Sequence, residues 1–149
     1  MSTPDATSIL PILKKIPLLE ELNEDDHREI IKHVTLEYYP AKHIIFNEGG
    51  LGDAVYIIKR GVVRIYHEGP GGDTDEEKEI AILGDNDVFG EMAIISEKPR
   101  NATAQTMEES EVFMLKKDDF VALISSNSGM ASRISGEFLK RLKINLRNL

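Results

Sequence analysis

The sequence contains no cysteine and no long apolar run, and these absences exclude several classes of protein. Without a thiol there is no disulfide, no cysteine nucleophile and no cysteine-ligated zinc, which fits a reducing compartment. No stretch reaches the roughly 18 apolar residues of a membrane-spanning helix, and residues 1–7 form a short polar N-terminus. We therefore expect a cytoplasmic protein that does not contact the membrane.

Basic charge is scarce as well. The chain carries 26 acidic and 18 basic residues, a net charge of −8, which argues against nonspecific binding of nucleic acid or an anionic membrane. Residues 68–91 hold nine acids against the single base Lys78, so this segment carries the whole excess. Its acidic run, Asp73 to Glu79, is most simply a solvated hairpin loop, because like charges repel one another and extend the chain.

Signatures of catalysis and metal binding are missing. The sequence has no GxSxG motif and no glycine-rich loop ending in GK[ST]. An EF-hand starting at Asp73 would need glycine at Lys78, and one starting at Asp85 has Phe89 where an oxygen ligand belongs. No HxH or HExxH pair is formed by the four histidines, His27, His33, His43 and His67. We therefore expect a protein that is not an enzyme and that has no metal and no cofactor. The absence of paired metal-binding histidines also disfavours an enzyme on a cupin-like barrel.

Hydrophobic periodicity predicts one domain over residues 1–149 that is mainly β with flanking α-helices. Residues 1–40 have helical spacing up to Tyr38, Tyr39 and Pro40, and residues 118–149 are helical again. Between them, turns rich in glycine and aspartate separate short strands, a pattern typical of an antiparallel roll or barrel. The predicted strands are His43 to Phe46, Ala54 to Lys59, Val62 to His67, Glu79 to Leu83, Ala102 to Met107 and Glu111 to Leu115.

The C-terminal region predicts two helices. A short one begins at Asp118, residues 125–129 interrupt it, and a last helix runs from about Met130 to the end. In the last helix, apolar residues at spacings of three and four form a stripe that either packs on the roll or makes a weak dimer seam. The stripe consists of Leu139, Leu142, Leu146 and Leu149.

Residues 88–103 combine features of a phosphate site. Gly90 follows a short strand and precedes an apolar stretch, where a glycine lets a ligand approach the backbone and a new helix N-terminus attracts an anion. Glu91 can accept hydrogen bonds from a hydroxyl pair on a sugar. Pro99 stops the helix, and Arg100 has the side chain best shaped for bidentate phosphate contact. The segment therefore indicates a site for a phosphorylated sugar, and the alternative is a surface helix with a Glu91–Arg100 ion pair.

The same residues resemble the phosphate-binding cassette of the cyclic nucleotide-binding domain family. The family pattern is FGE, an apolar residue and Ala, then Pro-Arg-x-Ala-Thr, and residues 89–93 and 99–103 meet it. Upstream, residues 45–49, 52–58 and 61–66 are similar to the family's early strands and glycine turns. The resemblance implies an eight-stranded antiparallel β-roll, or jelly roll, over residues 41–117. It also implies N-terminal helices, a short phosphate-binding helix in the cassette, residues 89–103, and hinge and lid helices over residues 118–149.

By this resemblance Glu91 accepts the ribose 2′-hydroxyl, Arg100 pairs with the cyclic phosphate, and Gly90 supplies a backbone contact. Family members often have Ala at the position of Asn101 when they prefer cAMP and Thr when they prefer cGMP, so Asn leaves the base open, and we favour cAMP. The residue of the lid helix that would contact the base is also undecided, and the candidates are Arg133, Arg141 and Asn145. The ligand-binding residues that we expect are Phe89, Gly90, Glu91, Met92, Ala93, Pro99, Arg100, Asn101 and Ala102.

These expectations together describe a cyclic nucleotide sensor. It would bind cAMP or cGMP and pass the signal to an unknown downstream protein partner through movement of its C-terminal helix. No helix-turn-helix, kinase domain or channel helix follows in these 149 residues, so we expect no direct nucleic acid contact and a chain that is free-standing or an excised domain. The alternative is a degenerate roll that serves as a protein-interaction or dimerisation module. We expect a monomer or a weak homodimer through the C-terminal helix.

Overall fold

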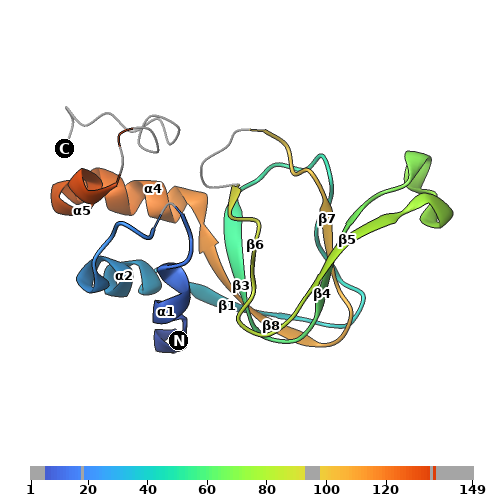
Figure 1. Ribbon diagram of the computed structural model, residues 1–149, viewed down its shortest axis with the longest axis horizontal. Coiled ribbons are helices and arrows are strands. Elements are labelled where there is room, and N and C mark those ends of the chain that lie inside the picture. Colours follow the sequence, from blue (N-terminus) through green and yellow to red (C-terminus); the bar gives the residue numbers. More distant parts are fainter. Residues whose placement is uncertain (1–5, 18, 93–97, 135, 137–149) are drawn as a thin grey trace.

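The protein, described here by a computed structural model, places its helices at one end of a two-layered β-roll (Figure 1). The structure describes residues 6–17, 19–92, 98–134 and 136. At the N-terminus lie the 3₁₀ turn η1 (Thr7–Ile9), α1 (Leu10–Leu13) and α2 (Glu24–Ile31). After the roll come α4 (Lys117–Ser126) and α5 (Ser128–Arg133), which lie beside the N-terminal helices in Figure 1.

The roll consists of two four-stranded antiparallel sheets, which confirms the predicted eight-stranded jelly roll. One sheet has the order β1-β8-β3-β6, and the other has the order β2-β7-β4-β5. Two 3₁₀ turns, η2 (Pro70–Gly72) and η3 (Thr74–Glu76), stand in the β4–β5 hairpin. The strands are β1 (Thr35–Tyr39), β2 (Ile44–Phe46), β3 (Ala54–Arg60), β4 (Val63–His67), β5 (Lys78–Leu83), β6 (Val88–Phe89), β7 (Thr103–Thr106) and β8 (Ser110–Lys116).

The prediction of helix up to Tyr39 is wrong. Helix α2 ends at Ile31, and residues 35–39 form strand β1, which pairs with β8 so that Leu36 lies opposite Phe113 and Tyr38 opposite Glu111. Threonine and tyrosine favour the pleated, half-buried surface of a sheet. The strand forms because β8, far along the chain, supplies its hydrogen-bond partners, and a local helical spacing does not reveal such a partner.

The predicted break between the two C-terminal helices is confirmed, but it is shorter than expected. Asn127 alone separates α4 from α5, and its side-chain oxygen accepts a hydrogen bond from the backbone N–H of Met130 at 2.9 Å. The predicted continuous helix from Met130 is interrupted at Ile134, whose backbone is extended (φ −89°, ψ 138°) and which is buried. The leucine stripe of residues 139–149 lies outside the described residues, as do Arg141 and Asn145.

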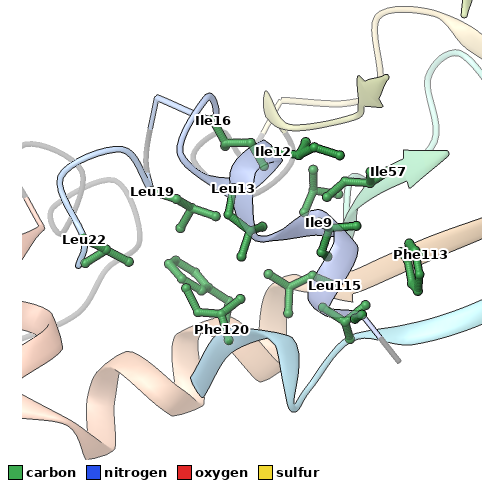
Figure 2. Packing of buried hydrophobic residues seen from close by; sticks show 14 of the residues in the cluster. Ile9, Ile12, Leu13, Ile16, Leu19, Leu22, Ile57, Phe113, Leu115 and Phe120 are labelled. Atoms are coloured by element: carbon green, nitrogen blue, oxygen red, sulfur yellow. The ribbon is translucent and has the colours of Figure 1, made fainter. Parts of the chain in front are cut away.

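Strand β3 separates two hydrophobic cores because its side chains alternate between its two faces. Val55 and Ile57 point into a core shared with the helices, where Leu13, Leu19 and Phe120 converge (Figure 2). On the other face, between the two sheets, a second core contains Ala54, Tyr56, Ile58, Val63, Phe89, Ala104 and Val112. The second core forms the floor beneath the site described next.

An ion pair fastens α5 to α2. Nε of Arg133 donates to Oδ2 of Asp26 at 2.6 Å, and Nη2 donates to Oδ1 at 2.6 Å. Asp26 is buried and also closes a capping box with Asn23, the N-cap residue of α2. The last turn of α5 is therefore held by the first turn of α2.

Candidate ligand-binding site

A cavity of about 380 Å³ opens between the ends of the two sheets. It brings together eight of the nine residues expected to bind ligand, and the ninth, Ala93, lies outside the described residues together with most of the predicted phosphate-binding helix. The cavity also has lining residues that the sequence did not single out for this site. Among the described residues, the lining is Phe46, Gly52, Ile65, Val88, Phe89, Gly90, Glu91, Met92, Lys98, Pro99, Arg100, Asn101 and Ala102.

Gly90 occupies a position that requires glycine. Its φ of +75° is in the left-handed region, which side chains other than glycine seldom adopt. A Cβ at this position would lie 2.7 Å from Nη1 of Arg100 and 3.3 Å from the carbonyl oxygen of Ala54. The absence of a side chain thus lets the Arg100 guanidinium lie directly against the backbone after β6.

Arg100 is the main charged group in the cavity. Its side chain is only 5% exposed. Nη1 donates to the carbonyl of Gly90 at 3.1 Å and Nη2 to that of Ala54 at 2.9 Å. Its Nε–H is buried and has no hydrogen-bond partner within the described part of the chain. A buried donor without a partner costs roughly 1–3 kcal/mol, so an anion that accepts from this N–H would be stabilised here.

Within the described part of the chain, no carboxylate forms a close ion pair with Arg100. Oδ1 of Asp53 lies 3.9 Å from Nη2 on a side chain that is 76% exposed, so the Glu91–Arg100 ion pair considered as an alternative is not what holds the guanidinium. Burial lowers the pKa of Arg100, and the negative charges of Asp53 and Glu91 oppose that shift. An arginine remains charged under these conditions. The cavity therefore contains a buried cation with unused capacity to bind an anion.

The backbone on both sides of Arg100 is fixed by the turn after β2. The N–H of Arg100 donates to the carbonyl of Gly50 at 2.7 Å, and the N–H of Gly49 donates to the carbonyl of Arg100 at 2.7 Å. Asn101, the next residue, is exposed at the cavity, whereas Ala102 is buried. Arg100 is thus presented on a rigid segment, and Asn101 lies where a ligand could still contact solvent.

Aromatic side chains form the apolar wall beside the cation. Cζ of Arg100 lies 4.0 Å from the ring centroid of Phe46. Phe46 in turn contacts Tyr56 and Phe89, whose own rings stack with centroids 5.0 Å apart. A cationic end next to an apolar wall suits a ligand that is anionic at one end and flat and apolar at the other.

Glu91 and Met92 complete the rim. Glu91 is half-buried and lines the cavity nine residues upstream of Arg100, while Met92 is 56% exposed. The Glu91 carboxylate offers only acceptors, which fits hydroxyl groups on a ligand. Among the described residues, no cluster of three or more His, Cys, Asp or Glu could hold a metal ion. None of the described helices has the length and hydropathy to cross a membrane.

The sequence reasoning expected Phe89 and apolar strand residues in this lining but did not name Phe46, Gly52, Ile65, Val88 or Lys98. Phe46 and Gly52 belong to segments that resemble the family's early strands, so that resemblance was the available signal. Ile65 lies in another such segment, residues 61–66, and the pairing of β4 with β7 places it opposite Ala104. A β-roll of two antiparallel sheets with a cavity around a buried arginine is the class of protein that this fold and cavity define.

The sequence profile of the cyclic nucleotide-binding domain matches residues 36–127, and the chain belongs to this family. It is 30% identical over 131 residues to a cyclic AMP receptor protein of Thermus thermophilus, which covers 88% of this chain and 59% of that protein. It is 31% identical over 119 residues to the cGMP-dependent protein kinase egl-4 of Caenorhabditis briggsae, covering 79% of this chain and 16% of that protein. The chain thus spans only part of the length of these curated relatives.

A solved structure extends the likeness to three dimensions. The cyclic nucleotide-binding-like protein from Brucella abortus is 26% identical and superposes with a TM-score of 0.69. The match covers 78% of this chain and 97% of that one. The family and the jelly-roll fold expected from the sequence are therefore confirmed.

Proposed function

We propose that this protein is a cyclic nucleotide sensor that binds cAMP at the cavity around Arg100, with cGMP as the competing ligand. The observation that carries the proposal is the buried guanidinium of Arg100, which has neither a partner for its Nε–H nor a close carboxylate among the residues that the structure describes. Family membership supports a cyclic nucleotide as the anion. The relatives include both a cyclic AMP receptor protein and a cGMP-dependent kinase, so they do not decide between the two bases.

In this proposal the cyclic phosphate binds Arg100 and the backbone at Gly90, and the Glu91 carboxylate accepts a hydrogen bond from the ribose 2′-hydroxyl. The base packs against the apolar wall, with Asn101 at its edge. These roles follow from the three kinds of group that line the cavity: a buried cation, a carboxylate that can only accept hydrogen bonds, and apolar side chains. A binding protein of this kind needs no catalytic group or metal.

In this proposal, strand β6 transmits the effect of ligand binding from the cavity to the C-terminal helices. Val88 lines the cavity and also packs against the helical core that contains Met130 and Ile134. A shift of β6 on ligand binding would therefore change the packing of α5, and a protein partner would detect the altered C-terminal helices. In this arrangement the whole chain acts as one regulatory domain.

Titration calorimetry of the purified protein with cAMP, cGMP and 5′-AMP tests the proposal. Arg100→Gln removes a charge-assisted contact of roughly 1.5–3 kcal/mol and should weaken cAMP binding by about 10- to 150-fold. Arg28→Gln is the matched control, because it removes the same charge from an exposed pair with Glu24 on α2 and should leave affinity unchanged. If neither cyclic nucleotide binds at millimolar concentration, the proposal is wrong.

A further inference from the structure

Thr103, the first residue of β7, is fully buried, and its hydroxyl is hydrogen-bonded twice. It accepts from the backbone N–H of Glu48 at 2.8 Å and donates to Oε1 of Glu68 at 2.7 Å. A buried hydroxyl whose donor and acceptor are both used holds its neighbours in one arrangement. Thr103 thereby joins the turn after β2 to the residue that follows β4.

The Glu48 carboxylate closes this network. Its Oε1 lies 2.9 Å from Nδ1 of His67 and accepts from the backbone N–H of Glu68 at 3.3 Å. Glu48 therefore contacts the end of β4 with its side chain and contacts Thr103 with its backbone. Three segments that are distant in sequence are joined at one point.

The same turn holds Arg100. Gly49 and Gly50, which follow Glu48 directly, make the two 2.7 Å backbone hydrogen bonds to Arg100 described above. Thr103 stands three residues after Arg100 on the short segment that leads into β7. The network thus fixes both the turn that is hydrogen-bonded to Arg100 and the segment that connects Arg100 to β7. None of Glu48, His67, Glu68 and Thr103 lines the cavity.

We propose that Thr103 and Glu68 are positioning residues for Arg100, so that affinity for the anionic ligand depends on two side chains that the ligand does not touch. This inference rests on the proposed function, because its effect on affinity is measured with cAMP. It also means that the base of the acidic β4–β5 hairpin, which begins at Glu68, is tied to the site through Thr103.

The strand offers a matched control for the test. Thr106, at the other end of β7, is equally buried, and its hydroxyl accepts from the N–H of His43 at 2.9 Å and donates to the carbonyl of Pro40 at 2.6 Å. The Thr106 hydroxyl also lies 3.3 Å from the carbonyl oxygen of His43. Thr103→Val and Thr106→Val therefore remove the same group from two equally buried positions, and the control loses no fewer partners than the test variant. The two positions differ in their distance along the strand from Arg100.

Two measurements on these variants test the proposal. Calorimetry should show a loss of about tenfold in cAMP affinity for Thr103→Val, recovery to within about threefold in Thr103→Ser, and no change in Thr106→Val. The ¹⁵N nuclear magnetic resonance signal of the Arg100 Nε–H in the protein without added nucleotide should shift in Thr103→Val and not in Thr106→Val.

The outcomes separate this inference from the proposed function. If the unmodified protein binds no cyclic nucleotide, the proposed function fails, and the Arg100 signal alone decides whether Thr103 positions that side chain. Equal effects of the two valine variants, or no effect of Thr103→Val, would overturn the inference. If Thr103→Val does not fold, Glu68→Ala replaces it, with Glu68→Gln as the variant that keeps an acceptor oxygen and should restore affinity.

Discussion

The ion pair between Asp26 and Arg133 predicts a measurable and pH-dependent contribution to stability. Asp26 is 3% exposed and accepts two hydrogen bonds from Arg133 at 2.6 Å as well as one from the N–H of Asn23 at 3.1 Å. Asp26→Asn keeps the size of the side chain and one acceptor oxygen but removes the negative charge. It also presents an amide N–H₂ group where Arg133 donates, which leaves those donors poorly paired.

The expected size of the effect follows from the geometry. Hydrogen bonds to a charged group contribute roughly 1.5–3 kcal/mol. Because the Arg133 side chain is 38% exposed, water recovers part of the loss, and we expect Asp26→Asn to lower the free energy of unfolding by about 2 kcal/mol at pH 7. For a chain of this length that corresponds to a fall in Tm of about 4–8 °C.

The pH dependence has a definite sign. The hydrogen bond from Arg133 lowers the pKa of Asp26 below its ordinary value of 3.8, against the opposing effect of burial. A carboxyl whose pKa is lower in the folded state stabilises the fold above its unfolded pKa and loses that effect as the pH falls through the folded value. The difference between the unmodified protein and Asp26→Asn should therefore be constant from about pH 7 to pH 5 and shrink below about pH 4.

Urea-induced unfolding followed by circular dichroism at several pH values measures this difference. Glu29→Gln is the control on the same helix, since Glu29 pairs with Lys32 at 2.7 Å on the exposed surface and should contribute only about 0.3 kcal/mol. The reasoning is refuted if Asp26→Asn costs no more than Glu29→Gln at pH 7. It is also refuted if the Asp26→Asn difference persists undiminished in acid.

Two further predictions concern the site and the sheet. Gly90→Ala places a Cβ 2.7 Å from Nη1 of Arg100 at a φ of +75°, so we expect a loss of about 1–2 kcal/mol in stability and a displaced guanidinium. Thermal unfolding together with cAMP calorimetry checks this, and unchanged affinity would contradict it. Burial raises the pKa of Tyr39 to about 12, so its neutral form is favoured in the fold and stability should fall as the pH rises above about 10. Tyr39→Phe should remove one ionisation step near pH 12 from the ultraviolet absorbance titration, and an unaltered titration would count against it.

The cassette could be predicted from the sequence because its chemistry is local. Gly90, Glu91 and Arg100 lie within eleven residues, and each has a physical role that its residue type alone suggests. The strand-like segments between glycine turns were equally readable, since turn residues and alternation act over short distances. The fold class and the family both followed from these short-range features.

What could not be predicted depends on contacts between distant segments. Strand β1 exists because it pairs with β8, and no feature within residues 35–39 reveals that partner. Likewise Ile65 and Phe46 reach the cavity only through the register of β4 and β2 with β7. The hydroxyl of Thr103 was visible in the family pattern, but its partners Glu48 and Glu68 lie 55 and 35 residues away.

The acidic segment shows why net charge is a poor guide to this site. Residues 68–91 carry the whole excess of −8, yet many of these carboxylates are occupied as acceptors within the fold. Glu77 pairs with Arg64 at 3.0 Å, Asp85 accepts from the N–H of Gly61 at 3.0 Å, and Glu68 accepts from Thr103. The run Asp73 to Glu79, expected as a solvated hairpin loop, is exposed over residues 73–76 and leads into β5, whereas Glu77 and acids outside this run have partners within the fold.

Glu91 is the one acidic residue among the described residues that line the cavity, where Arg100 and Lys98 supply positive charge. Charges beyond the Debye length of about 8 Å are largely screened at physiological salt. Among the described residues, Asp53 and Glu91 are the carboxylates whose charges act on Arg100. An anionic ligand is compatible with an acidic protein because the fold directs its carboxylates into hydrogen bonds elsewhere and leaves one buried guanidinium with an N–H to donate.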